Sequence, residues 1–153
     1  MKLLFVCTGN TCRSPLAEAL MRKLLAERRV EGVTVASAGT GAWVGAPASE
    51  GSYLVALEDG VDLSAHRAQP LTPELATGSD LILTMSRSHR QRLGEMGLGD
   101  RTFLLGEYAG RSGAAAEVDD PYGGSLTDYR DTYIQLKELL DSVVQRVERE
   151  RTP

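Results

Sequence analysis

Residues 2–25 read KLLFVCTGNTCRSPLAEALMRKLL and contain two kinds of regular structure in succession. The apolar run from Lys2 to Val6 predicts a buried strand. From Leu16 onward, leucines recur every four residues, which predicts a helix with one buried face. Ser14 suits the N-cap of that helix and Pro15 its first turn, where no amide hydrogen is needed. The stretch therefore predicts a strand, a short loop and a helix.

The rest of the chain continues this alternation between strand-like and helix-like patterns. Such alternation indicates an α/β fold, a parallel sheet with helices on both faces, which is a three-layer sandwich. A long C-terminal helix is predicted to open at Ser125, with its apolar stripe in the core. The other predicted strands are Val33–Ser37, Asp80–Thr84 and Thr102–Leu105, and the other predicted helices are Ser49–Glu58, Thr72–Ala76 and Ser86–Met96.

The composition predicts one globular domain over residues 1–150, followed by a frayed tail at 151–153. No segment is long and apolar enough to cross a membrane, and the apolar run at the start is too short for a secretory signal. The net charge of −4 argues against nucleic-acid binding, because a phosphate backbone is held by clustered Lys and Arg. We therefore expect a cytoplasmic monomer that binds neither nucleic acid nor membrane.

The loop at residues 7–14 has the composition of a phosphate-binding site. A cysteine ends the strand, an arginine follows six residues later, and a helix begins at once. Consecutive amides leading into a helix N-terminus form a cup for anions, and Gly9 and Asn10 tolerate the positive φ angles that such a curve requires. Arg13 adds a planar fork that fits two phosphoryl oxygens. The residues expected to bind phosphate are Thr8, Gly9, Asn10, Thr11, Cys12, Arg13 and Ser14.

The same positive surroundings favour the thiolate form of Cys7 and make it a candidate nucleophile. Ser14 is placed to donate a hydrogen bond to that sulfur. The alternative is a buried structural cysteine beside a surface arginine. The loop lacks the Gly-Lys-Ser/Thr ending of a Walker motif, and His66 and His89 do not have the spacing of metal ligands, so we expect no metal and no cofactor. The two histidines are expected to have solvated or hydrogen-bonded structural roles.

A second catalytic group is sought in the segment from Gly110 to Gly124, which has no helical or strand periodicity. Long loops without regular structure in compact domains are usually functional. This one contains Asp119, Asp120 and Pro121. An ordinary Asp-Pro turn is the alternative explanation.

The motif VCTGNTCRSP at residues 6–15, together with Asp120-Pro121-Tyr122, resembles the low-molecular-weight protein tyrosine phosphatases. The resemblance spans nearly the whole chain and includes the sequence SAGT at residues 37–40. It implies a four-stranded parallel sheet in the order 2-1-3-4 and phosphorylated proteins as substrates. It also implies a phosphocysteine intermediate on Cys7, with Arg13 binding the transition state and Asp120 as general acid. Asp119 is adjacent and could take the place of Asp120.

Two branches of this family remain open for the substrate. The position of Thr11 usually carries a larger apolar residue in tyrosine-specific relatives, whereas the small polar residue here resembles the protein arginine phosphatase branch. On the other side, Trp43 and Tyr122 could stack on a phosphotyrosine ring, although an arginine side chain can stack there too. We favour phosphoarginine, with phosphotyrosine as the alternative.

Three further hypotheses concern the cysteines and the class of protein. Cys7 and Cys12 are close enough in sequence to form a reversible disulfide that would make the enzyme redox-sensitive, although Cys12 could instead be a packed thiol. Arsenate reductases with a similar loop need further cysteines, and this chain has none. A non-catalytic phosphoprotein-binding module would keep the anion cup but not the acid, so the presence of Asp120 disfavours it.

Overall fold

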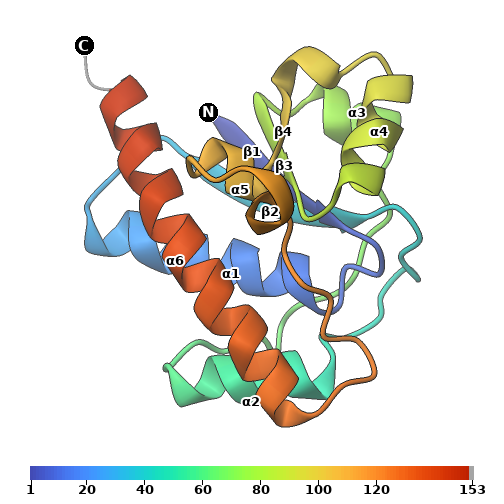
Figure 1. Ribbon diagram of the computed structural model, residues 1–153, viewed down its shortest axis with the longest axis vertical. Coiled ribbons are helices and arrows are strands. Elements are labelled where there is room, and N and C mark those ends of the chain that lie inside the picture. Colours follow the sequence, from blue (N-terminus) through green and yellow to red (C-terminus); the bar gives the residue numbers. More distant parts are fainter. Residues whose placement is uncertain (152–153) are drawn as a thin grey trace.

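Four parallel strands form the centre of the molecule, in the order β2-β1-β3-β4 (Figure 1). The computed structural model describes residues 1–151, so Thr152 and Pro153 of the predicted tail lie outside the described residues. The strands are β1 (Lys2–Cys7), β2 (Thr34–Gly39), β3 (Leu81–Thr84) and β4 (Thr102–Leu104). The predicted α/β class, the parallel sheet and the strand order are confirmed.

Helices cover both faces of this sheet, as Figure 1 shows. One layer contains the two long helices, which pack against each other, and the opposite layer contains α3 and α4. The α-helices are α1 (Arg13–Glu27), α2 (Glu50–Glu58), α3 (Pro73–Thr77), α4 (Arg87–Glu95), α5 (Leu105–Tyr108) and α6 (Leu126–Arg151), and two 3₁₀ turns lie at η1 (Gly99–Arg101) and η2 (Gly113–Ala116).

The central strand β1 is buried on both sides because its side chains alternate between the two layers. Leu3 and Phe5 pack among residues of α1, α2 and α6, whereas Leu4 and Val6 pack against Leu93 of α4 and its neighbours. All four are at most 1% exposed. The loop after β1 therefore leaves the sheet at a fixed point, where β1 lies between β2 and β3 and the order of the chain reverses. In open α/β sheets this is where ligands bind.

Three local features differ from expectation. The helix after the loop begins at Arg13 with Cys12 at the N-cap, so Ser14 lies inside its first turn rather than capping it. The C-terminal helix continues through Arg151, one residue beyond the predicted domain boundary, and the Arg151 guanidinium donates to the Glu31 carbonyl at 3.0 Å. The Gly110–Gly124 segment is not wholly irregular, since it contains the η2 turn.

Candidate active site

The sulfur of Cys7 lies at the end of β1 and is almost completely buried. Its Sγ is 2.9 Å from the hydroxyl oxygen of Ser14 and accepts a hydrogen bond from the Asn10 amide at 3.3 Å. Ser14 is directed at the sulfur, as the sequence predicts. Because the hydroxyl is used in this way, it is not free to cap the helix, which explains the helix start at Arg13.

Asn10 fixes the curve of the loop from the inside. It has a φ of 56°, the left-handed conformation expected for this loop, and its side chain is completely buried. Its Nδ2 donates to Ser14 Oγ at 2.7 Å and to Ser37 Oγ at 2.9 Å, and its Oδ1 accepts the Gln69 amide at 2.9 Å. Gly9 does not have a positive φ, so the expectation for that residue is wrong.

These contacts determine which groups donate and which accept in the hydrogen bonds around the Cys7 sulfur. Ser14 Oγ accepts from Asn10, so its own hydrogen is available for Cys7. Ser37 also accepts from Asn10 and donates to the carboxylate of Glu18, which pairs with Arg22 at 2.6 Å. A hydrogen bond donated to a thiolate favours that charged form over the thiol.

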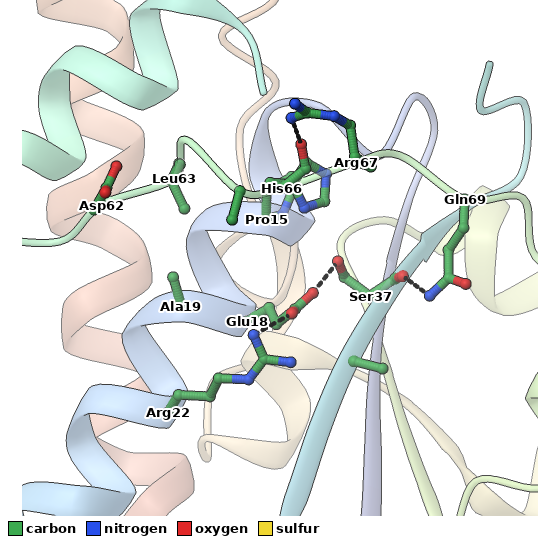
Figure 2. A pocket seen from close by; sticks show the side chains of 12 residues that line it. Pro15, Glu18, Ala19, Arg22, Ser37, Asp62, Leu63, His66, Arg67 and Gln69 are labelled. Carbon is green, nitrogen blue, oxygen red and sulfur yellow. Dashed lines mark hydrogen bonds and ion pairs between the residues drawn. The ribbon is translucent and has the colours of Figure 1, made fainter. Parts of the chain in front are cut away.

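A cavity of about 290 Å³ lies behind the loop, lined by α1, β2 and the segment 62–69 (Figure 2). Figure 2 shows the Glu18 carboxylate between Arg22 and Ser37, and the side chain of Gln69 bonded to the backbone of Ser37. His66 lines the same cavity, and its Nε2 donates to the Asn10 carbonyl at 2.6 Å. The cavity contains neither Cys7 nor Asp120, so it supports the loop and is not the place of the chemistry.

Arg13 has one hydrogen-bond donor without a partner among the described residues. Its side chain is buried; Nη1 donates to the Val118 carbonyl at 3.2 Å, and Nη2 lies 3.5 Å from the Asp120 carboxylate. The Nε–H is buried and has no hydrogen-bond partner among the described residues. A buried, unpaired donor on a cation costs free energy unless an anion binds it. The guanidinium is therefore suited to an oxyanion.

One cavity of about 260 Å³ brings the predicted groups together, and it is lined by Cys7, Thr8, Gly9, Thr11, Cys12, Arg13, Asp120 and Tyr122. Asp120 is half-exposed in this cavity, and its Oδ1 accepts the Tyr122 amide at 3.1 Å. Asp119 lines an adjoining hollow instead, and its backbone is held by Gln135 and Thr132 of α6. Asp120, and not Asp119, therefore shares a cavity with Cys7.

The two aromatic residues expected to contact substrate are placed differently. Tyr122 lines the Cys7 cavity although it is 79% exposed. Trp43 is 84% exposed and does not line that cavity. Thr11 does line it, beside the sulfur and the arginine. Of the three proposed specificity residues, Thr11 and Tyr122 are thus at the pocket itself.

Cys12 is a free thiol that α2 and α6 hold in place. Its Sγ donates to Ser49 Oγ at 3.3 Å and is 3.7 Å from the Tyr129 hydroxyl, while Ser52 donates to its carbonyl. Burial, together with the contact to Cys12, raises the pKa of Tyr129. Cys7 and Cys12 are both unpaired here, and their oxidation to a disulfide stays a prediction.

Several residues that support the loop were not singled out from the sequence for this role. Ser37, His66 and Gln69 contact Asn10, and His89 contacts Thr8. The histidines are hydrogen-bonded, as expected, but both reach the phosphate loop. These contacts could not be predicted from local sequence patterns, because each joins residues at least 27 positions apart in the sequence.

The fold and the site together define a cysteine-dependent phosphatase. The family model "Low molecular weight phosphotyrosine protein phosphatase" matches residues 2–152, and the chain belongs to that family. The resemblance seen in the sequence is thereby confirmed.

Individual relatives match over nearly their whole length. The protein-arginine-phosphatase of Bacillus subtilis is 39% identical over 99% of both chains. The low molecular weight protein-tyrosine-phosphatase PtpB of Staphylococcus haemolyticus is also 39% identical, over 92% of this chain and 95% of its own. A solved structure of the YwlE arginine phosphatase, a cysteine-to-serine mutant with a phosphorylated active-site serine, is 40% identical with a TM-score of 0.90, covering 99% of this chain and 98% of its own.

No group of three or more His, Cys, Asp and Glu side chains within residues 1–151 is arranged to hold a metal ion. Within the same part of the chain, no helix has both the length and the apolar character needed to cross a membrane.

Proposed function

We propose that this phosphatase removes phosphate from phosphoarginine residues in proteins, through a phosphocysteine intermediate on Cys7. The observation that carries the proposal is the buried Nε of Arg13, which has no partner among the described residues, on a residue that lines one cavity with Cys7 and Asp120. A nucleophile, an oxyanion-binding cation and an acid in one cavity are the groups that phosphoryl transfer through a covalent intermediate requires.

In the first step the Cys7 sulfur attacks phosphorus, and the phosphorus–nitrogen bond of the substrate breaks. Asp120, in its acid form, gives its proton to the departing guanidino nitrogen. In the second step the Asp120 carboxylate takes a proton from water as that water attacks the phosphocysteine. The sulfur–phosphorus bond breaks, and Cys7 leaves as a thiolate that Ser14 stabilises by its hydrogen bond.

Charge on the phosphoryl oxygens is met by Arg13 and by the loop amides. Of the amides from Thr8 to Cys12, only that of Asn10 donates a hydrogen bond within the described chain. The others are available to a bound phosphoryl group, and fixed donors of this kind stabilise developing charge without reorganising. This function requires no metal and no cofactor.

The role of Asp120 is tested by Asp120→Asn, with Asp119→Asn as the matched control. Loss of a general acid typically costs 10²- to 10⁴-fold in rate, so we expect turnover of a small aryl phosphate to fall about 10²-fold or more for the first variant and little for the second. Steady-state kinetics of both variants measure this. Equal turnover by Asp120→Asn and the unchanged protein would contradict the assignment.

The substrate class rests on Thr11, a small polar side chain that lines the pocket beside Arg13. A narrow guanidinium fits next to it, and the carbonyl oxygen of the nearby Asp120 carboxyl group can accept a hydrogen bond from a substrate nitrogen. An isoleucine at this position would remove the hydroxyl and add apolar surface suited to a phenyl ring. We therefore expect Thr11→Ile to lower the ratio of phosphoarginine to phosphotyrosine turnover by about tenfold or more.

Parallel assays of phosphoarginine and phosphotyrosine peptides of one sequence measure that ratio. Thr11→Ser, which keeps the hydroxyl, is the control and should keep the preference. The rival function is a phosphotyrosine phosphatase, which the similarity to the staphylococcal enzyme and the exposed ring of Tyr122 in the pocket favour. A higher kcat/KM for phosphotyrosine in the unchanged protein would establish that alternative.

We also propose that the enzyme acts as a cytoplasmic monomer on phosphorylated proteins and not on nucleic acid. The net charge of −4 supports the last point, because it opposes association with a polyanion.

A further inference from the structure

A histidine on α4 contacts the phosphate loop from the opposite layer of the sandwich. His89 is only 3% exposed, and its Nε2 lies 2.9 Å from the hydroxyl oxygen of Thr8. Thr8 is exposed and lines the cavity that contains Cys7 and Arg13. The contact therefore joins a buried ring to a side chain of the active site.

The other ring nitrogen of His89 determines where the proton is. The backbone N–H of Ser86 donates to His89 Nδ1 at 3.1 Å, and a backbone amide can only donate. Nδ1 is thus the unprotonated nitrogen of a neutral ring, and Nε2 carries the hydrogen. It follows that His89 donates to Thr8 Oγ1, and that the hydroxyl hydrogen of Thr8 is not used in this contact.

The neutral form of this ring is maintained by its surroundings. Burial, and next the positive charge of Arg13, lower the pKa of His89 to about 4, while the carboxylates of Asp120 and Glu117 oppose the shift. At neutral pH the ring is therefore uncharged and keeps one donor and one acceptor. No acceptor for the Thr8 hydroxyl hydrogen is found among the described residues.

We propose that His89 is a positioning residue that holds the Thr8 hydroxyl with its hydrogen toward the pocket, where the hydroxyl donates to a phosphoryl oxygen. A threonine hydroxyl rotates to suit its partners, and a fixed donor on its oxygen removes the competing orientation in which the hydroxyl donates to His89. The inference rests on the proposed function, since it adds one donor to the same phosphate site.

A double-mutant cycle on inorganic phosphate binding tests the inference. Thr8→Val removes the hydroxyl and nearly keeps the shape of the side chain. His89→Asn keeps an acceptor close to the Ser86 amide but is too short to reach Thr8. We expect Thr8→Val to weaken phosphate binding about tenfold, as for one hydrogen bond to a charged acceptor, and His89→Asn to weaken it about threefold to tenfold.

The decisive measurement is the double variant, because a residue that acts through Thr8 should have no effect once the hydroxyl is gone. Calorimetric titration with phosphate should give the same affinity for Thr8→Val with and without His89→Asn. His89→Gln, whose amide N–H can take the place of Nε2–H, should restore most of the affinity. A merely structural histidine would instead give losses that add in the double variant, and would lower the melting temperature to the same extent in both backgrounds.

Additive losses, or full phosphate affinity in Thr8→Val alone, would overturn the inference. Thr8 is exposed, so that single variant is expected to fold and remains informative even if His89→Asn does not. Turnover of phosphoarginine peptides by the unchanged protein is measured separately. Failure there contradicts the proposed function, whereas failure of the phosphate cycle contradicts only the role of His89.

Discussion

Replacement of Asn10 tests whether buried hydrogen bonds, which lie outside the substrate pocket, hold the phosphate loop in its conformation. Asn10→Ala removes three side-chain hydrogen bonds, of 2.7, 2.9 and 2.9 Å, at a site that is completely buried. Each contributes about 1 kcal/mol net. Alanine must also adopt the φ of 56°, which costs about a further 1 kcal/mol in the left-handed region. We therefore expect the free energy of unfolding to fall by about 4 kcal/mol.

Asn10→Gly is the matched control for the backbone contribution. It loses the same three hydrogen bonds but adopts the left-handed conformation freely, so it should be about 1 kcal/mol more stable than Asn10→Ala. Urea denaturation, with the slope checked for each variant, gives both differences. Total stabilities of about 5–15 kcal/mol leave either variant able to fold.

Activity provides the second readout for Asn10. Without the side-chain amide of Asn10, the Ser14 hydroxyl no longer accepts a hydrogen bond from Nδ2. Its own hydrogen is then no longer directed at the Cys7 sulfur. A misplacement of about 1 Å at a reacting group can cost on the order of 10²-fold, so we expect turnover of an aryl phosphate to fall by about that factor in both variants. Equal stability of the alanine and glycine variants would refute the backbone argument. A loss below about 1 kcal/mol in both would refute the hydrogen-bond argument.

Two further predictions concern packing and pH. A Cβ on Gly106 would lie 2.3 Å from the Cα of Ala116, so Gly106→Ala should destabilise the protein by about 3 kcal/mol in thermal unfolding and lower turnover. A Cβ on Gly94 would have no atom within 4 Å, so Gly94→Ala should stabilise the protein by about 0.5–1 kcal/mol. The pKa of His89 is lowered to about 4, so between pH 6.5 and 4 the unfolded chain takes up the proton first and stability is lost as the pH falls. We expect this loss of unfolding free energy to be about 2 kcal/mol, allowing for solvent screening, and to be absent from His89→Gln. If the stability of the unchanged protein and that of His89→Gln fall in parallel as the pH is lowered, the prediction is contradicted.

Local patterns predicted the parts of this fold that depend on burial. The apolar run after Lys2 gave β1 within one residue, because a strand buried on both faces must be apolar throughout. The regular spacing of leucines and valines likewise gave the two long helices. The sequence did not give α5, Leu105–Tyr108, because four residues are too few to show a helical period.

The observed start of α1 differs from the predicted start because two roles compete for the side chain of Ser14. Ser14 followed by Pro15 is a typical helix opening, and propensity alone favours it. In the folded chain the Ser14 hydroxyl instead lies between Asn10 and Cys7. The requirements of the sulfur thus replace the usual cap, and the deviation occurs at the functional site, where such deviations are expected.

The close approach of two backbone segments explains why residue 39 is a glycine, which the sequence motif alone does not explain. Gly39 ends β2 in the sequence SAGT, and a Cβ there would lie 2.3 Å from the Thr8 carbonyl oxygen. Any side chain would therefore push the phosphate loop away from the end of the sheet. The motif marks the position, but only the three-dimensional contact gives the reason.

Cys7 and Asp120, the proposed nucleophile and acid, lie more than a hundred residues apart in the sequence, and the backbone of Val118 links the two segments. The Val118 amide donates to the Met85 carbonyl just after β3 at 2.8 Å, and the Val118 carbonyl accepts Arg13 Nη1 at 3.2 Å. Asp120 follows two residues later, so these two bonds hold the backbone next to it close to Arg13. Backbone bonds of this kind leave no trace in residue types. For this reason the sequence predicts which residues carry the chemistry but not what holds Asp120 beside Arg13.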